Sequence, residues 1–372
     1  MDVVELTGEF VRHNSVSTRS NASVSAAIAK SMRAAGLTVE RLEYRDANHV
    51  RKVCRVGKKG QGAGGLALMG HSDIVPAEGW AWDPFAVIQK KGRLYGRGTA
   101  DMKGAIACML VATERFSRSK LKCPVYVIVT ADEEIDCSGA RYIAEHSKTF
   151  RNADIAYGII GEPTMLDVVY AHKGSLRIQA TAKGKAAHSS TGRGINANHI
   201  MIPFLNDVLK IDRQIRENPK YRDESFSPPH SGCNIVISDG ESASNITAPE
   251  SRATINCRPI PGHNWAPITR RIQALGKKHG VKLEISSSLL PVYTPPDSRI
   301  VQEALRITGK RKPKTVPYGT DGMIFGKYME LVIMGPGNIA QAHTVDEWIA
   351  IDQLHRGVEV YAEMIRRFCV EG

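Results

Sequence analysis

Residues that can bind a metal ion follow a short apolar run near residue 70. The run 66–69 ends at Gly70, His71 and Asp73 come directly after it, and Asp101 lies further on in a glycine-flanked segment. A buried strand that ends in His and Asp is one way in which an α/β domain presents metal ligands to a crevice. Taken alone, a His-x-Asp pair is more often a polar exit from a strand, so the prediction depends on further residues.

More carboxylates and a second histidine follow other apolar runs. Glu133, Glu134, Glu162 and His343 each come shortly after a segment that is typical of a buried strand. In a parallel sheet the carboxyl ends of the strands open onto one crevice, so we expect these side chains to converge. Two histidines and several carboxylates, without a thiolate, favour Zn²⁺ or a similar divalent ion in an open catalytic site. Each position alone could be a helix cap, and it is the set that favours a metal site.

The residue types suit a hydrolase with two metal ions. One Asp can bridge two cations about 3.5–4 Å apart, and each cation then takes one histidine and one further carboxylate. Another carboxylate must stay off the metals in order to take a proton from water and pass it to a leaving amine. The adjacent Glu133 and Glu134 permit this division into ligand and base, and Asp73 can orient the ring of His71.

The elements that must position these residues alternate between strand and helix. The predicted strands of the first half of the chain are 37–42, 50–56, 66–69, 125–130 and 155–160. The predicted helices are 1–14, 22–35, 102–116 and 138–146, and 85–95 has the pattern of a hairpin. This alternation predicts an α/β fold with a mainly parallel sheet that is flanked by helices on both faces.

After residue 164 the pattern becomes that of an α+β domain. Alternating strands are predicted at 175–183, 234–238, 251–258 and 282–286, and helices at about 196–215 and 266–278. The α/β pattern resumes near residue 297 and closes with a strand at 330–334 and a helix from residue 352. We therefore predict a discontinuous catalytic domain, 1–174 and 288–372, around an inserted domain, 175–287.

The charge of the chain raises the question of nucleic-acid binding. The 372 residues include 50 Lys and Arg against 38 Asp and Glu, which gives a net charge of +12. The basic clusters, of which 310–314 is the longest, are short, separated and free of interleaved aromatic residues. They favour a solvated surface with a weak general attraction for anionic substrates, and we predict no nucleic-acid partner.

The cysteines and the apolar segments indicate the compartment. Seven cysteines are scattered along the chain and form no Cys-x-x-Cys pair, which predicts reduced thiols without a disulfide framework or a thiolate zinc site. The first residues do not have the pattern of a secretory signal, and no apolar run has the length of a membrane span. We therefore expect a cytoplasmic protein with no membrane partner.

Seven segments occur in the form and order of a known family. They are His71-Ser72-Asp73-Ile74-Val75-Pro76, Trp82-Asp83-Pro84-Phe85, 96–104, Asp132-Glu133-Glu134, Gly161-Glu162-Pro163-Thr164, Ala187-His188-Ser189-Ser190 and the segment around His343. On these segments the chain resembles the M20 metallopeptidases, especially the branch of acetylornithine deacetylase and succinyl-diaminopimelate desuccinylase. The resemblance implies a zinc-peptidase-like fold whose inserted, ferredoxin-like domain is a lid that forms a homodimer.

The resemblance also implies the metal ligands. His71, Asp101 and Glu162 would bind one Zn²⁺, and Glu134, Asp101 and His343 would bind the other, with Asp101 as the bridge. Two Zn²⁺ per subunit are implied, with Co²⁺ or Mn²⁺ as alternatives. The family places the bridging Asp before a cis peptide bond, which would be Asp101-Met102 here.

Roles for five further residues follow from the same resemblance. Glu133 would be the general acid and base, and Asp73 would orient His71. His188 would reach the site of a neighbouring subunit and stabilise the oxyanion. Asn245 and Arg258 would hold the carboxylate of the substrate, for which the planar guanidinium is well suited.

Two departures from the family leave the substrate open. Asn256-Cys257 stands where an acidic residue is usual, and 318–322 replaces the Thr/Ser-Gly-Gly stretch of desuccinylases. We predict hydrolysis of the amide bond of a small N-acyl amino acid, as in acetylornithine deacetylases, by metal-activated water with a Glu general base. The alternatives are a succinyl-diaminopimelate desuccinylase, an M20 dipeptidase or aminopeptidase, and, more remotely, a non-catalytic binding protein on this fold.

Overall fold

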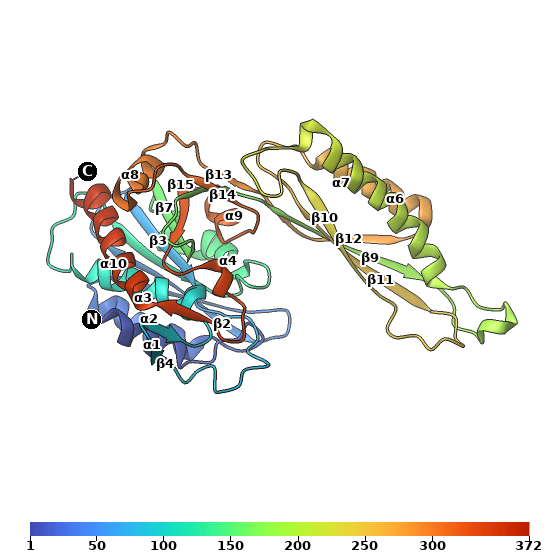
Figure 1. Ribbon diagram of the computed structural model, residues 1–372, viewed down its shortest axis with the longest axis horizontal. Helices are drawn as coiled ribbons and strands as arrows, with labels where there is room; N and C mark the ends of the chain where they lie inside the picture. The colour runs from blue at the N-terminus through green and yellow to red at the C-terminus, as the bar shows by residue number, and fades with distance from the viewer. Residues whose placement is uncertain (372) are drawn as a thin grey trace. The chain divides into compact units, whose positions relative to one another are not determined.

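The computed structural model describes residues 1–371 and divides into two compact units (Figure 1). The first unit comprises Met1–Ala171, Tyr293–Lys314 and the chain from Thr320 onward, and the second comprises His172–Val292 and Thr315–Gly319. The second unit thus extends a few residues beyond 175–287 on both sides. It also includes Thr315–Gly319, which the sequence pattern assigned to the catalytic domain.

A nine-stranded sheet forms the centre of the first unit. Its order is β1-β2-β6-β3-β7-β15-β8-β13, and β14 pairs with β8. The bounds are β1 (Thr38–Arg45), β2 (Arg51–Lys59), β3 (Leu66–His71), β6 (Val125–Thr130), β7 (Tyr157–Pro163), β8 (Val169–His172), β13 (Val292–Tyr293), β14 (Lys314–Val316) and β15 (Glu330–Gly335). The central strands β6, β3, β7 and β15 are parallel, whereas β1 and β2 run antiparallel, so the predicted mainly parallel sheet is confirmed.

The buried strands carry apolar residues on both faces because helices cover the sheet on both sides. Every residue of β3 and β6 is buried. Figure 1 shows α3 and α10 on one side of the sheet and α4 and α9 on the other. The helices are α1 (Val3–Val11), α2 (Ala22–Ala34), α3 (Gly104–Glu114), α4 (Ser138–His146), α5 (Lys148–Arg151), α8 (Arg299–Thr308), α9 (Gly322–Phe325) and α10 (Ile351–Ile365).

A small second sheet in the first unit joins distant parts of the chain. The predicted hairpin is present as β4 (Ile88–Lys90) and β5 (Arg93–Tyr95), and β16 (Trp348–Ala350) pairs with it in the order β16-β5-β4. Trp348 lies opposite Tyr95. The chain just after residue 347 is therefore held beside the chain just before Gly96.

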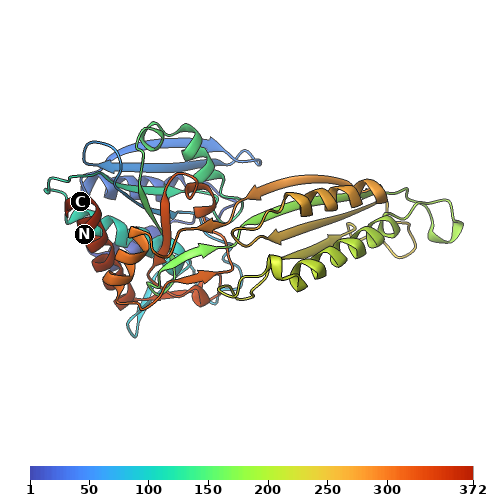
Figure 2. The ribbon, with the colours of Figure 1, turned by 90° about the horizontal axis from the view of Figure 1, so that it is seen from above.

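The second unit is a four-stranded antiparallel sheet with two helices on one face (Figure 2). The strand order is β10 (Gly232–Ser238), β11 (Glu250–Arg258), β9 (Ser175–Lys183) and β12 (Lys282–Leu289). Residues of β9 and β11 are alternately buried, as expected of strands with one covered face. Their apolar side packs against α6 (Ala197–Glu217) and α7 (Ala266–His279).

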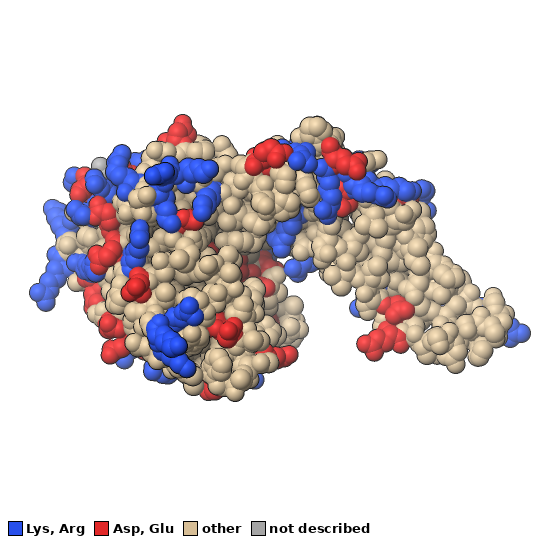
Figure 3. All heavy atoms as spheres, viewed as in Figure 1, with Lys and Arg blue, Asp and Glu red and all other residues tan. Residues whose placement is uncertain are grey.

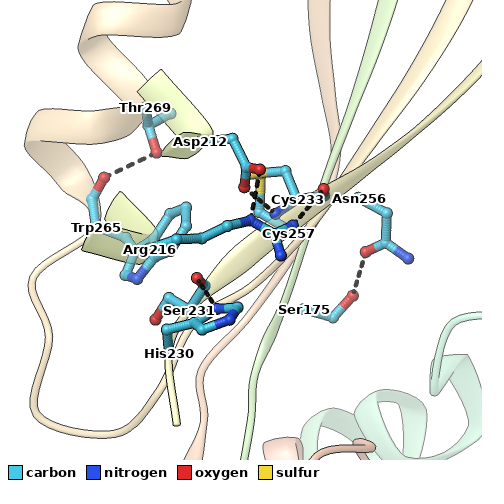
Figure 4. The surroundings of a disulfide bond; sticks show 10 residues. All are labelled: Ser175, Asp212, Arg216, His230, Ser231, Cys233, Asn256, Cys257, Trp265 and Thr269. Carbon is cyan, nitrogen blue, oxygen red and sulfur yellow. Dashed lines mark hydrogen bonds and ion pairs between the residues drawn. A yellow bond between two sulfur atoms is a disulfide. The ribbon is translucent and has the colours of Figure 1, made fainter. Parts of the chain in front are cut away.

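A disulfide bond in the second unit corrects the prediction that all seven cysteines are reduced thiols. Cys233 of β10 and Cys257 of β11 lie directly opposite each other, with their Cα atoms 3.9 Å apart, and are joined by a disulfide (Figure 4). The other five cysteines are free. The prediction is wrong for this pair because it used only the spacing of cysteines along the chain, and their contact depends on the register of two strands.

The surface charges and the hydropathy of the helices bear on the predictions about nucleic-acid and membrane partners. Lys and Arg are interspersed with Asp and Glu on the face shown in Figure 3. Within the cluster 310–314, Lys310 and Lys314 form ion pairs with Asp167. Among the described residues, no helix combines the length and the hydropathy that a membrane span requires.

Candidate metal centre

The carboxyl ends of three neighbouring strands bring the first ligands together. His71 is the last residue of β3 and lies beside Thr130, the last residue of β6. Glu162 lies near the end of β7, the other neighbour of β3. Because β3, β6 and β7 are parallel, their polar ends share one edge of the sheet.

Two groups of possible ligands form around one carboxylate. His71, Asp101 and Glu162 offer ligand atoms that all lie within 4.8 Å of one another, and so do Asp101, Glu134 and His343. The two oxygens of Asp101 face different histidines. Oδ1 lies 3.2 Å from Nε2 of His71, and Oδ2 lies 3.3 Å from Nε2 of His343. This arrangement lets a single carboxylate serve two cations.

The backbone around Asp101 is irregular. The segment Thr99–Lys103 precedes α3, and the φ and ψ angles of Asp101 (−123° and 92°) are outside the helical region. The peptide bond Asp101-Met102 is cis, which confirms the expectation from the family resemblance. Asp101 therefore does not receive its orientation from a regular helix.

Asp73 contacts both the first histidine and the loop after β6. Nδ1 of His71 lies 3.0 Å from the carbonyl oxygen of Asp73 and 3.6 Å from its Oδ1. A hydrogen bond at Nδ1 leaves Nε2 of His71 as the ligand atom. The carboxylate of Asp73 also accepts a hydrogen bond from Ser17 Oγ at 2.8 Å and lies 3.4 Å from the backbone nitrogens of Glu133 and Glu134.

Residues 67–367 match the family model described as peptidase family M20/M25/M40. The chain belongs to this family. The match covers the whole first group of ligands, the second group and the inserted unit.

Solved structures of M20 peptidases share the fold. An M20 family metallo-carboxypeptidase from Sulfolobus solfataricus is 18% identical with a TM-score of 0.78, and the alignment covers 98% of this chain and 99% of that one. A tripeptidase from Staphylococcus aureus is 20% identical with a TM-score of 0.75 over 98% and 97% of the two chains. A dinuclear metal-binding M20 peptidase from Bacillus subtilis is 14% identical with a TM-score of 0.68 over 98% and 96%. At these identities the likeness establishes the fold alone.

Charge interactions in this M20 centre fit divalent cations. Burial alone would raise the pKa of Asp101, but the contacts with His343 and His71 outweigh burial and lower it. Burial raises the pKa of both Glu134 and Glu162, and the charge of Asp101 adds to the effect. Contacts with Asp101 and Glu134 raise the pKa of His343 to about 10. Such closely spaced carboxylates need positive charge to ionise together, and a bound divalent ion supplies it.

Glu133 differs from the candidate ligands in position and surroundings. It is half-buried and belongs to neither ligand group. Burial raises its pKa well above the usual range, the charge of His71 opposes this shift, and the charge of Glu162 reinforces it. A carboxyl group with a raised pKa can hold a proton near neutral pH, which suits an acid–base group.

Three buried residues near the M20 centre were not predicted from the sequence. Asp321 accepts a hydrogen bond from the hydroxyl of Thr130 at 2.5 Å, and burial raises its pKa to about 6. Lys52 forms a buried ion pair with Asp132 at 2.7 Å. Glu347 is buried beside the segment that carries Asp101. The sequence signal for Asp321 was the unusual stretch 318–322, and the other two gave none.

The three predicted residues of the second unit do not all lie together. His188 pairs with Ile246 in a short antiparallel bridge, and Ser189 donates its N–H to the carbonyl oxygen of Asn245 at 2.9 Å. His188 and Asn245 are therefore neighbours and both are exposed. Arg258 ends β11, which begins at Glu250 near Asn245, so the length of the strand separates them by roughly 25–30 Å.

Proposed function

We propose that this M20-family protein is a zinc-dependent amidohydrolase that removes the acyl group from a small N-acyl amino acid, as acetylornithine deacetylases do. The observation that carries the proposal is the division of four carboxylates. Asp101 faces two histidines through separate oxygens, Glu134 and Glu162 complete one ligand group each, and Glu133 stays outside both. This is the donor set that a two-metal hydrolase with a separate acid–base group requires.

The residues of the first unit have distinct tasks in this proposal. His71, Asp101 and Glu162 hold one ion, and Asp101, Glu134 and His343 hold the other. When bound, two divalent ions lower the pKa of water and polarise the amide carbonyl. Glu133 accepts the proton that the attacking water releases and delivers it to the nitrogen of the departing amine.

We further propose that two copies of the chain complete each active site. Arg258 and Asn245 are our candidates for the substrate carboxylate, and His188 is our candidate for stabilising the oxyanion. One second unit holds His188 and Arg258 a strand length apart. A single small substrate can therefore meet all three residues only if they come from two copies of the chain, and we propose that the partner copy supplies His188 and Asn245.

An apolar edge of the second unit supports the homodimer. β10 is an edge strand, and edge strands are ready to pair with another chain. Val236 and Ile237 on β10 are 61% and 58% exposed, and Ile202 and Leu209 on the neighbouring helix α6 are 62% and 47% exposed. Exposed apolar residues that gather on one edge favour a protein interface.

A peptidase acting on short peptides is the second candidate. The solved M20 structures named above include a tripeptidase and a carboxypeptidase, and the stretch 318–322 departs from that of desuccinylases. Metal analysis combined with a turnover screen separates these candidates. We expect two ions per chain and turnover of N-acetyl amino acids such as acetylornithine in preference to N-succinyl amino acids, dipeptides and tripeptides. Binding of metal without turnover of any of these amides would instead favour a non-catalytic protein.

A further inference from the structure

A buried carboxylate, Glu347, lies under the segment that carries the bridging ligand. The side chain is fully buried. Its Oε1 accepts the backbone N–H groups of Ala100 at 2.9 Å and Asp101 at 3.1 Å. Its Oε2 accepts the backbone N–H of Gly98 at 3.0 Å and a guanidinium N–H of Arg97 at 2.8 Å. Four donors thus converge on one carboxylate.

These hydrogen bonds replace those that a helix would supply. Backbone N–H groups that are buried need a partner, and the irregular backbone of Thr99–Lys103 gives Ala100 and Asp101 none within a regular element. The carboxylate of Glu347 provides both. The orientation of the Asp101 backbone, and with it the direction of the two carboxylate oxygens, therefore depends on Glu347.

The same residue anchors the loop of the second histidine. His343 lies four positions before Glu347 on a loop, its side chain is 55% exposed, and its φ angle is 64°. After the loop, the carbonyl of Glu347 accepts the N–H of Gly96 at 3.0 Å, and β16 pairs with β5. By contrast, His71 and Glu162 are held in the central strands β3 and β7.

We propose that Glu347 is a positioning residue that sets the metal affinity of the group Asp101, Glu134 and His343 more than that of the group His71, Asp101 and Glu162. The inference rests on the proposed two-metal function. Its reason is that Glu347 holds two of the three ligand-bearing segments of one group, the Asp101 segment and the His343 loop. In the other group it holds only the shared Asp101.

The substitution Glu347→Gln tests this selectivity. Gln has nearly the same shape, but its NH₂ group must face N–H donors, and the charge partner of Arg97 is lost. The matched control is Glu359→Gln on α10, which removes an exposed ion pair with Arg115. Both variants and the unmodified protein are stripped of metal and titrated with Zn²⁺, and the bound ions are counted by mass spectrometry.

We expect the unmodified protein and Glu359→Gln to bind two ions. In Glu347→Gln the first ion should bind with nearly unchanged affinity, and the second should bind about tenfold or more weakly, the range that outer hydrogen-bond partners of ligands command. If Glu347→Gln binds both ions as tightly as the unmodified protein does, or if the affinities for the two ions fall by the same factor, the inference is overturned. If the unmodified protein itself binds fewer than two ions, the proposed function fails instead.

A milder variant keeps the inference testable should Glu347→Gln fail to fold. Arg97→Lys removes the planar guanidinium but leaves the carboxylate and its three backbone N–H donors in place. We expect the same selective weakening of the second ion, smaller in size. Unfolding temperatures in excess chelator report any general loss of stability, which would lower the affinity for both ions. An unchanged second affinity in Arg97→Lys then counts against the role of Glu347.

Discussion

Glu133 and Glu134 are neighbours in the chain, yet only Glu134 contacts a histidine. Oε2 of Glu134 lies 3.2 Å from Nε2 of His343, and Glu134 shares a ligand group with Asp101. Glu133 belongs to neither group, and its pKa is raised mainly by burial. Two identical side chains on one turn are thereby suited to different tasks, one as a metal ligand and one as an acid–base group.

The first prediction separates these tasks with the same substitution at both positions. Glu133→Gln should bind metal normally and lose about 10²–10⁴-fold in kcat, because an amide cannot take up the proton that the reaction releases. Glu134→Gln should bind one ion less tightly, because the amide is a weaker ligand than a carboxylate. Metal content and kcat are measured for both variants. Near-normal turnover by Glu133→Gln would remove Glu133 from the mechanism.

Residues at the ends of apolar runs could be predicted because the run itself determines their place. An unbroken apolar run such as 66–69 indicates a strand buried on both faces, and parallel strands have their carboxyl ends on one edge. His71 and Glu162 therefore come together for reasons that are visible locally. The resemblance to the family added the division of the ligands into two sets, with Asp101 shared and His343 in the second set.

Residues whose partners are backbone groups could not be predicted. Glu347 is one of many glutamates in the sequence, and nothing local shows that four donors around 97–101 meet it. The short strand β16 that follows was missed because it pairs with a distant hairpin and has only three residues. The pairing of Cys233 with Cys257 was missed for a similar reason, since the intervening loop sets the register of β10 and β11.

The disulfide gives the second prediction. It closes a loop of 24 residues in sequence separation, and such a cross-link stabilises a fold by about 2–4 kcal/mol, largely by restricting the unfolded chain. The double variant Cys233→Ser, Cys257→Ser should lower the free energy of unfolding by about this amount, measured by urea unfolding of the metal-loaded protein. Cys123→Ser, at a free and half-buried cysteine, is the control.

Reductant provides the second arm of the disulfide experiment. Dithiothreitol should destabilise the unmodified protein and Cys123→Ser but leave the double variant unchanged, because the double variant has no bond to reduce. If dithiothreitol has no effect on the unmodified protein, the bond contributes nothing to its stability.

The third prediction concerns the pH dependence of stability. The pKa of His172 is lowered to about 4: burial and, to a smaller extent, the nearby charge of Arg258 lower it, while a hydrogen bond from Nδ1 to the Lys173 carbonyl opposes the shift. An unfolded histidine has a pKa near 6.5. Between these values the unfolded chain binds a proton that the folded chain does not. The contribution of neutral His172 to the free energy of unfolding is therefore complete above pH 6.5 and is lost as the pH falls towards 4.

The measurement is urea unfolding at pH 7.0, 5.5 and 4.5 for the unmodified protein and for His172→Gln, which cannot titrate. We expect the free energy of unfolding of the unmodified protein to fall by up to about 3 kcal/mol more than that of the variant between pH 7.0 and pH 4.5. His199→Gln, at an exposed position on α6, serves as the control and should follow the unmodified protein. Parallel pH curves for the unmodified protein and His172→Gln would show that His172 titrates normally.

The last prediction tests the second copy. Val236→Lys places a charge on the apolar edge formed by β10 and α6, which we propose as the dimer interface. The variant should be a monomer by light scattering at concentrations where the unmodified protein is a dimer, because burying an unpaired ammonium group opposes association. It should also retain two metal ions and lose most of its kcat, since His188 would no longer be supplied by a partner.

Leu290→Lys is the control, because Leu290 is similarly exposed but lies after β12, at the opposite edge of the sheet. A monomeric Val236→Lys protein with full activity would show that one copy of the chain is sufficient for catalysis.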